Sequence, residues 1–293
     1  MRERVTEKAY SKLNLSLDVL GKRADGYHEM LMVMQSISLC DELSLTFSDG
    51  DGEISVFTNK SYLPTNEKNL AFVSAKKYLE AAGVSDKNIR IDLKKVVPVC
   101  AGMGGGSSDA AAVLRALNRH FGGKLSSDEL MELGAAIGSD VPFCITGGTM
   151  LAYGRGTDFK ALPEMPDCGF VIIKPQFSIK TPELFAAIDS IKLKARPDTD
   201  GLIEAIEKGS IIEVSRRVFD VFEAALPQKY RDTIDKAKLE LIDSGALGAS
   251  MTGTGSAVFG IFESESAARE AVSKLRASFK EVYFAGKIGR IDV

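Results

Sequence analysis

The sequence predicts an α+β protein of two domains, each a layer of strands with helices packed against it. The chain has 293 residues, which is long for one hydrophobic core and sufficient for two. Apolar and polar residues alternate in several short runs of the first half, as in half-buried strands. Two prolines interrupt the pattern in the run Leu162-Pro-Glu-Met-Pro-Asp167. We therefore expect an N-terminal domain over residues 1–162 and a C-terminal domain over 163–293.

The elements of the first half follow from periodicity and from capping signals. Residues at every second position predict two strands, one through Leu43, Leu45 and Phe47 and one through Ile89, Ile91 and Leu93. Helical spacing predicts a helix over 69–82. Ser126 and Glu129 form a capping box, which predicts the start of another helix.

The second half contains apolar runs and helical spacings in alternation. We expect strands at Gly169–Ile173, Ala257–Phe262 and Val282–Ala285. Helices are expected at Asp200–Glu207, Ile212–Ala224, Gln228–Asp243 and Glu265–Phe279.

Composition excludes several classes of function. The net charge of −3 provides no basic surface, so we expect no nucleic-acid partner. No apolar run approaches about 20 residues, so no membrane span is expected. The four cysteines are widely spaced and only two histidines are present, which favours reduced thiols over disulfides or zinc. The charged run from Met1 to Lys8 lacks the apolar core of a signal peptide, and we expect a cytoplasmic protein.

The strongest local signal is the run from Pro98 to Leu114, Pro-Val-Cys-Ala-Gly-Met-Gly-Gly-Gly-Ser-Ser-Asp-Ala-Ala-Ala-Val-Leu, after a strand expected to end at Val97. Its glycines allow positive φ angles and a close approach of N–H groups to an anion; they are Gly102, Gly104, Gly105 and Gly106. Ser107 and Ser108 then open an alanine-rich helix to about Asn118, and a helix start attracts anions. The run predicts a site for a polyphosphate.

The alternative for this run is an ordinary glycine-rich turn with Ser108 or Asp109 as the N-cap. The order strand, loop and helix favours the phosphate site. No Gly-Lys-Ser or Gly-Lys-Thr follows, so the run is not a Walker A motif, and it lacks the Gly-x-Gly-x-x-Gly spacing of dinucleotide folds.

Three weaker signals complete the set. The run Met251-Thr-Gly-Thr-Gly-Ser256 is by itself more typical of a tight turn, and it gains meaning only beside the first loop. Lys12 and Asn14 share one face of a predicted strand, which is either solvated or functional. Asp140 follows a predicted helix, as a turn residue or as a functional one. A lysine beside a carboxylate keeps it ionised, and the carboxylate can then accept the proton of a substrate hydroxyl.

Together these segments resemble the GHMP kinases, small-molecule kinases with a glycine-rich loop of the form Pro-x₃-Gly-[Leu/Met]-Gly. The resemblance extends to the subfamily that phosphorylates cytidine-diphosphate-linked methylerythritol. The matching runs are Ala9–His28, Gly104–Ala111, Gly138–Phe143, Gly147–Gly156 and Met251–Ser256. The runs Arg-Ala-Asp-Gly-Tyr-His and Gly-Gly-Gly-Ser-Ser-Asp are specific to this subfamily, whereas the glycine loop alone indicates only the superfamily.

The resemblance implies a two-domain GHMP kinase fold, with a ribosomal-protein-S5-like N-terminal domain and a ferredoxin-like C-terminal domain. It implies that ATP, with Mg²⁺, phosphorylates the 2-hydroxyl of 4-diphosphocytidyl-2-C-methyl-D-erythritol, a step of mevalonate-independent isoprenoid synthesis. A monomer and a homodimer both remain open.

The resemblance also implies residue roles. Asp140 is the catalytic base and Lys12 is the lysine paired with it. Asn14 orients the methylerythritol. The expected cytidine site consists of Tyr27, His28 and Phe185, with Thr252 and Gly253 completing the substrate site. The expected ATP site consists of Pro98, the four glycines, Ser107, Ser108, Asn69 and Lys95, with Ser108 as the candidate magnesium ligand. Without the resemblance, Tyr27 and His28 are loop residues and Phe185 is a core residue.

Two residues depart from the family pattern: Cys100 stands where glycine is common, and Met103 stands where leucine is usual. Met103 conserves volume and should be tolerated. Cys100 adds a side chain, and a thiol, beside the nucleotide loop. Two alternative functions remain: a GHMP kinase of mevalonate, homoserine or a sugar, and a catalytically silent nucleotide-binding regulator. The run Gly26-Tyr-His28 opposes the first, and the retained Lys12 and Asp140 oppose the second.

Overall fold

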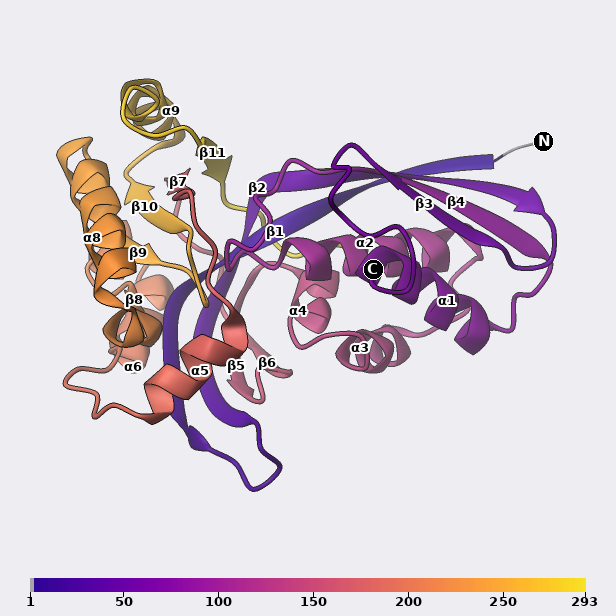
Figure 1. Cartoon of the computed structure of the whole chain (residues 1–293), viewed down its shortest axis with the longest axis horizontal. Coiled ribbons are helices and arrows are strands. Elements are labelled where there is room, and N and C mark those ends of the chain that lie inside the picture. Colours follow the sequence, from indigo (N-terminus) through magenta and orange to yellow (C-terminus); the bar gives the residue numbers. More distant parts are fainter. Residues whose placement is uncertain (1–2) are drawn as a thin grey trace.

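The computed structural model describes residues 3–293; Met1 and Arg2, the first residues of the charged N-terminal run, lie outside it. Two sheets form the frame of the molecule, one on each side in Figure 1. The strands of the first sheet are β1 (Glu3–Lys22), β2 (His28–Asp49), β3 (Ile54–Thr58), β4 (Lys87–Lys94), β5 (Thr149–Gly154), β6 (Asp158–Ala161) and β8 (Phe219–Asp220). The strands of the second sheet are β7 (Gly169–Ile173), β9 (Gly248–Met251), β10 (Val258–Phe262) and β11 (Val282–Gly286).

Strands β1 and β2 dominate the first sheet and extend from its far end to the second sheet (Figure 1). They pair antiparallel along most of their length. Beyond that pair, β2 is bonded to β4 through its second half and to β5 through its first half. The predicted strands through Leu43 and through Ile89 are confirmed as parts of β2 and β4. The alternation did not reveal how long β1 and β2 are, because register shifts interrupt their pairing.

Helices cover one face of the first sheet (Figure 1). They are α1 (Leu70–Ala82), α2 (Gly105–His120), α3 (Ser127–Ala135) and α4 (Val141–Thr146). The predicted helix over 69–82 is confirmed, with Asn69 as its N-cap. The capping box of Ser126 and Glu129 is confirmed in both directions. Helix α2 begins at Gly105, so the two serines lie within its first turn and neither Ser108 nor Asp109 is the N-cap.

The second sheet has the order β11-β7-β10-β9, and its bonded neighbours are antiparallel. Numbered along the sheet's own strands, this order is 4-1-3-2, the arrangement of a ferredoxin-like fold. The helices of this half are α5 (Thr181–Asp189), α6 (Thr199–Glu207), α7 (Ile211–Ser215), α8 (Gln228–Asp243) and α9 (Glu265–Leu275), with the 3₁₀ helix η1 (Val221–Ala225). The α+β class and the ferredoxin-like half are therefore confirmed.

Some predicted bounds were wrong. The helix expected over Ile212–Ala224 is three elements, α7, β8 and η1. Tertiary pairing overrides helical spacing here, because Phe219 and Asp220 pair in parallel with Ser16 and Leu17 of β1. The strand expected to end at Val97 ends at Lys94, and the helix expected to reach Phe279 ends at Leu275. Helices α4 and α5 and strands β3, β5, β6 and β9 were not predicted.

The two halves share a core and exchange segments. Leu13 and Leu15 of β1 lie in one buried cluster with Phe170 and Phe259 of the second sheet. The short strand β8 of the second half completes the first sheet. Beyond β11 the chain returns to the first half, where isolated bridges join it to Ile37 and Gly147. The domain boundary at residue 162 therefore remains a prediction, because later segments cross back over it. No helix in the described residues has the length and apolar character needed to cross a bilayer.

Arg115 of α2 connects three elements and is 2% exposed. Its guanidinium donates to the Glu7 carboxylate at 3.0 Å, the Lys8 carbonyl at 2.9 Å and the Cys144 carbonyl at 2.6 Å. These contacts set β1 and α4 at a fixed spacing. Lys12 lies on β1 and Asp140 is the N-cap of α4, so the contacts of Arg115 help to fix the distance between these two side chains.

Asp220 of β8 gives the fold a testable dependence on pH. Burial, and secondarily Glu223, raises the pKa of its carboxyl well above the ordinary value of 3.8. One carboxyl oxygen accepts from the Phe222 N–H at 3.0 Å, and the other has no hydrogen-bond partner within residues 3–293. The folded protein thus holds a proton that the unfolded chain releases, so the free energy of unfolding falls as pH rises above about 4 through the folded-state pKa.

We expect Asp220→Asn, which is neutral at every pH, to exceed the parent in stability at pH 8 and to lose this advantage towards pH 4. Urea unfolding midpoints of both proteins at several pH values measure the difference. The exposed Asp235→Asn change on α8 is the control and should follow the parent. Parallel pH profiles for parent and Asp220→Asn would contradict the assignment.

Candidate active site

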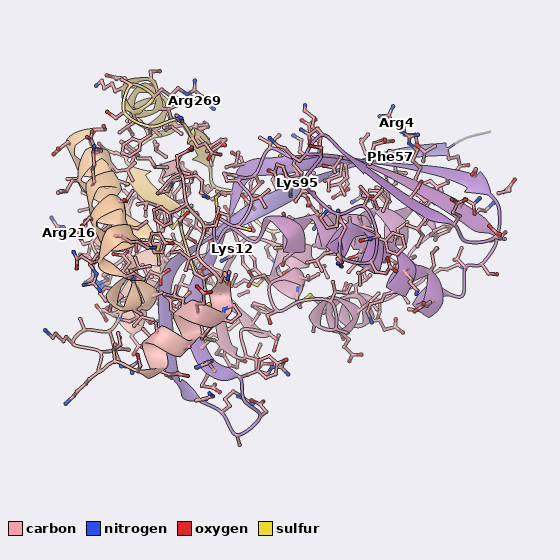
Figure 2. The ribbon with its side chains drawn as sticks, viewed as in Figure 1. Arg4, Lys12, Phe57, Lys95, Arg216 and Arg269 are labelled. Atoms are coloured by element: carbon pink, nitrogen blue, oxygen red, sulfur yellow. The ribbon has the colours of Figure 1, made fainter. Side chains whose placement is uncertain are left out.

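A cavity of about 1170 Å³ lies between the two halves of the molecule. Its walls come from β1, β2, the glycine loop, α5 and the loop after β9. Figure 2 places Lys12, one of its lining residues, where the two halves meet. A smaller cavity of about 360 Å³ adjoins it and shares Cys100, Gly102, Gly104 and Ser107. The glycine loop therefore separates two connected spaces.

The glycine loop forms the start of α2. Gly104 is the N-cap with φ 67°, and it has no side chain that could cap the helix. The N–H groups of the first turn therefore remain available to bind an anion. Ser107 lines both cavities. Ser108 is 1% exposed and its hydroxyl donates to the Gly105 carbonyl at 2.9 Å. Cys100 has φ 54°, a left-handed backbone in which glycine is favoured over a residue with a side chain.

The second glycine-rich run lies directly against the first loop. Ala257 N–H donates to the Ala101 carbonyl at 3.1 Å, which joins the loops through their backbones. The Thr252 hydroxyl accepts from the Asn14 N–H at 2.9 Å. The run is a tight turn between β9 and β10, closed by a bond from the Gly255 N–H to the Thr252 carbonyl at 3.1 Å. The same turn lies against the first loop, which brings Thr252 and Gly253 to the same site as β1.

Gly102 is the point of closest approach between the loops. Its φ is 76°, and a Cβ there would overlap the Thr252 carbonyl and lie 2.9 Å from the Gly255 nitrogen. Only glycine combines this backbone angle with this proximity. Gly102 is therefore required both by conformation and by space.

Lys12, Asn14 and Asp140 converge below the loops. The Lys12 ammonium donates to the Asn14 amide oxygen at 2.5 Å and lies 3.9 Å from the Asp140 carboxylate. The Lys12 side chain is 5% exposed and that of Asp140 is 33% exposed, so the carboxylate is the group open to the cavity. Lys12 N–H also donates to the Met103 carbonyl at 3.1 Å, which ties β1 to the glycine loop. The alternative of a solvated strand face is wrong.

Lys95 is buried between two carboxylates. Its ammonium contacts Asp41, donates to Asp109 at 2.6 Å and approaches the Gly105 carbonyl at 3.4 Å. Burial raises the pKa of the Asp109 carboxyl despite the opposing charge of Lys95. Lys95 lines the smaller cavity, and its donors are engaged with the protein. It therefore secures the first turn of α2 to β2.

Asn69 also lines the smaller cavity, where its side chain caps α1. Its amide oxygen accepts from the Ala71 N–H at 3.0 Å, and its amide nitrogen donates to the Pro64 carbonyl at 2.8 Å. Both polar ends thus hold the segment before α1, which with Leu63 and Lys68 forms one wall of that cavity.

Tyr27, His28 and Phe185 line the far end of the larger cavity. They come from the β1–β2 hairpin and from α5. His28 stacks on Phe185 with ring centres 4.5 Å apart, and the Arg155 guanidinium lies 3.6 Å from the centre of the Tyr27 ring. Each ring thus has one face covered by protein. Tyr27 is 52% exposed, which leaves its other face accessible.

Sequence reasoning missed several cavity residues, and two of them, Arg155 and Asp189, carry charges beside the aromatic group. Arg155 lies in the run 147–156, whose resemblance was noted without a role for the arginine. Asp189 ends the unpredicted helix α5 and contacts His28, 161 positions away along the chain, so no local pattern could find it.

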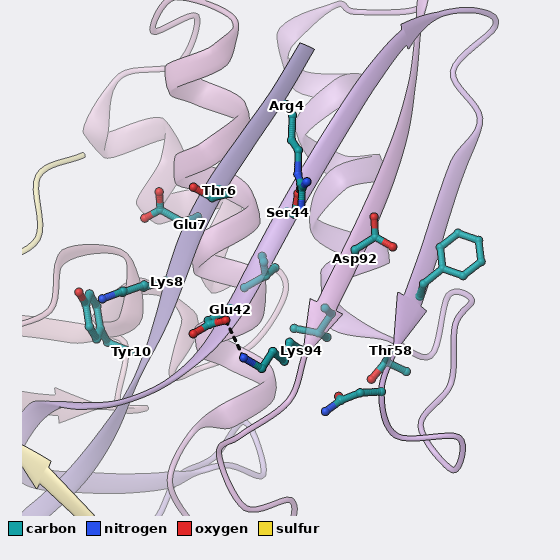
Figure 3. Close-up of a pocket in the computed structure, with 14 residues that line it drawn as sticks. Arg4, Thr6, Glu7, Lys8, Tyr10, Glu42, Ser44, Thr58, Asp92 and Lys94 are labelled. Carbon is teal, nitrogen blue, oxygen red and sulfur yellow. Dashed lines mark hydrogen bonds and ion pairs between the residues drawn. The ribbon is translucent and has the colours of Figure 1, made fainter. Parts of the chain in front are cut away.

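A separate hollow of about 740 Å³ lies on the first sheet, over β1, β2, β3 and β4 (Figure 3). Its lining mixes charges of both signs, with Arg4, Glu7 and Asp92 among them, and Lys94 pairs with Glu42 at 3.0 Å. It shares no residue with the two cavities at the glycine loop apart from Leu93. The chemistry described above therefore lies elsewhere.

Comparison with known proteins supports the kinase interpretation. The model of the GHMP kinases N terminal domain matches residues 69–148, and that of the GHMP kinases C terminal matches residues 202–281. A 4-diphosphocytidyl-2-C-methyl-D-erythritol kinase of Caldicellulosiruptor saccharolyticus is 42% identical over 94% of both chains. The enzyme of that name from Bacillus pumilus is 42% identical over 98% of both chains.

Solved structures agree. A crystal structure of 4-(cytidine 5'-diphospho)-2C-methyl-D-erythritol kinase superposes with a TM-score of 0.81 at 31% identity, covering 97% of this chain and 99% of the other. Homoserine kinase from Cytophaga hutchinsonii, at 23% identity and a TM-score of 0.75, covers 100% of this chain and 98% of its own and shares the fold. The chain belongs to the GHMP kinases and, within them, to the family of 4-diphosphocytidyl-2-C-methyl-D-erythritol kinases.

Proposed function

We propose that this chain transfers the γ-phosphate of ATP to the 2-hydroxyl of 4-diphosphocytidyl-2-C-methyl-D-erythritol. One observation carries the proposal: Lys12 and Asp140 lie in a single cavity, between a glycine-rich helix start at one side and the Tyr27–His28–Phe185 group at the other. ATP bound at the helix start and a substrate whose cytosine lies at the aromatic group would thus meet at the Asp140 carboxylate.

The transfer makes one O–P bond and breaks one. The substrate hydroxyl oxygen bonds to the γ-phosphorus, the bond to the bridging oxygen breaks, and ADP leaves. The hydroxyl proton passes to the Asp140 carboxylate, the group at the site that is open to the cavity. Lys12, held by Asn14, offsets negative charge at the reacting oxygens. Positioning by fixed groups supplies much of the acceleration in such reactions.

The glycine loop is the proposed ATP phosphate site, with Pro98, Gly102, Gly104, Gly105, Gly106 and Ser107 around the phosphates. Asn69 and Lys95 line the adjoining cavity, and because both side chains are bonded to the protein, their proposed role is to hold the shape of its walls.

No group of three His, Cys, Asp or Glu side chains in the described residues could hold a metal unaided. Mg²⁺ commonly takes most of its oxygens from phosphates and water. Ser107 lines both cavities and is the serine that could contribute a hydroxyl to its coordination, while the Ser108 hydroxyl is already bonded.

The proposed cytidine site uses the free faces of the aromatic residues. The cytosine ring stacks against Tyr27, with Phe185 beyond, and His28 bonds to its edge. Arg155 holds the opposite face of Tyr27 and so fixes the plane of stacking. Thr252 and Gly253 lie over Asn14 and Lys12, where the methylerythritol would be held.

ATP consumption with Mg²⁺ and four acceptors tests the proposal: the cytidyl-linked methylerythritol, mevalonate, homoserine and galactose. Turnover confined to the first is expected. Turnover on another acceptor would retain the phosphate site and remove the cytidine site. ATP binding without turnover on any acceptor would favour a nucleotide-binding regulator.

Asp140→Asn should lower kcat by about 10²- to 10⁴-fold, the usual contribution of a general base, because the amide cannot accept the proton. The affinity for ATP should change little, since the phosphate site lies on α2. Steady-state kinetics and ATP titration measure the two quantities. Asp243→Asn, an exposed change at the end of α8, is the control. A near-normal kcat for Asp140→Asn would remove this residue as the base.

Tyr27→Ala should raise the KM for the cytidyl substrate by about 5- to 150-fold, because base–aromatic stacking contributes about 1–3 kcal/mol. The KM for ATP should stay near the parent value. Tyr27→Phe keeps the ring and should restore most of the affinity. An unchanged KM in Tyr27→Ala would show that the base does not stack there.

A further inference from the structure

The His28 ring is held from two directions by residues of α5. Phe185 stacks on one face at 4.5 Å, with an angle of 30° between the planes. The ring nitrogen Nε2 lies 2.8 Å from a carboxylate oxygen of Asp189, the last residue of the helix. The stack fixes the plane of the ring, and the contact with Asp189 fixes its rotation within that plane. The His28 side chain is 11% exposed, so little freedom remains.

We propose that Asp189 is a positioning residue: by orienting the His28 ring and fixing its tautomer, it determines which pyrimidine base His28 can bind. A carboxylate only accepts hydrogen bonds, so the 2.8 Å contact requires a proton on Nε2. In the neutral ring the other nitrogen, Nδ1, is then an acceptor. Within residues 3–293 no hydrogen bond involves Nδ1 of His28, so this acceptor is free for a ligand in the cavity.

A free acceptor at this position selects between pyrimidines. Cytosine presents a 4-amino donor, whereas uracil presents a 4-oxo acceptor at the same place. Nδ1 can accept a hydrogen bond from the amino group of cytosine. Against the oxo group of uracil it would place one lone pair opposite another, which is repulsive. Asp189 thereby makes His28 a reader of the amino group. This inference rests on the proposed function, because it takes the base of the substrate to lie against His28.

The surroundings favour this role over a purely structural one. Among residues 3–293 the other ion pair of Asp189 is with Lys22, 3.7 Å away with its side chain 62% exposed, and such an exposed pair contributes little to stability. The Asp189 side chain is 34% exposed and lines the cavity. Its contact with His28 joins α5 to the β1–β2 hairpin at the cavity wall, so a change in this contact would alter the surface that a bound ligand meets.

Nitrogen-15 NMR of histidine-labelled protein tests the tautomer without any variant. The chain has two histidines, His28 and His120, so the side-chain signals can be assigned with one His120→Gln sample. We expect a proton on Nε2 of His28, which faces Asp189, and none on Nδ1. A proton on Nδ1, or on both nitrogens, would overturn the proposal.

Calorimetric titration with CDP and with UDP tests the discrimination independently of catalysis. An unpaired acceptor typically costs 1–3 kcal/mol, so the parent should bind CDP about 5- to 150-fold more tightly than UDP. Asp189→Ala should reduce this ratio towards one, because the ring can then adopt either tautomer. The matched control is Glu183→Ala, which removes an exposed carboxylate from the same helix and should keep the ratio.

The outcomes separate this inference from the proposed function. Turnover of the cytidyl substrate with equal binding of CDP and UDP would overturn the role of Asp189 and leave the kinase intact. A preference for CDP that Asp189→Ala removes, in a protein without turnover, would support the role of Asp189 and contradict the proposed reaction. An unchanged ratio in folded Asp189→Ala, or no binding of either nucleotide, would also overturn the proposal.

Discussion

The backbone of Gly102 lies against the backbone of Thr252, and the geometry of the site depends on this contact. It brings a loop of the first half onto a loop of the second at a distance that no side chain would permit. The bond between Ala257 and Ala101 extends the same junction. Because both loops also touch β1, through Met103 and Thr252, the strand that carries Lys12 is held from both sides.

The chemistry follows from that constraint. Lys12 is buried and bonded to Asn14, so its charge cannot move away from the cavity. Arg115 ties β1 to the chain of α4, whose N-cap is Asp140, by donating to the Glu7 carboxylate and to the Cys144 carbonyl. Lys95 joins the start of α2 to β2 through Asp109 and Asp41. Each of these buried charges has a partner of opposite sign or a carbonyl, as burial requires.

Much of the fold could be predicted because its signals are local. Residues close together in the sequence determine the capping box of Ser126, the helix after Asn69 and the apolar run of β7. The segment over 212–224 was predicted wrongly because its conformation depends on pairing with β1, about 200 positions earlier. Helix α5 escaped notice because it has only 9 residues and two buried side chains.

The site shows the same division. Resemblance drew attention to Lys12, Asp140, Tyr27 and His28, and the structure places all four in one cavity. Sequence spacing could not show that the Lys95 ammonium is occupied by Asp41 and Asp109, or that Asp189 faces His28. These contacts join residues 54, 14 and 161 positions apart, and only the packing of the sheets and helices defines them.

The central claim, that the junction of the two loops builds the site, is tested most directly by Gly102→Ala compared with Gly122→Ala. Both glycines have φ 76°, but an added Cβ overlaps Thr252 only at Gly102 and meets open space at Gly122. The two variants therefore share the backbone strain of about 1–2 kcal/mol and differ in the clash.

The measurement is kcat/KM for the cytidyl substrate in folded protein. The account predicts a loss of about 100-fold or more for Gly102→Ala, since small misplacements of reacting groups carry that cost, and a value near the parent for Gly122→Ala. Equal activity of the two variants would contradict it.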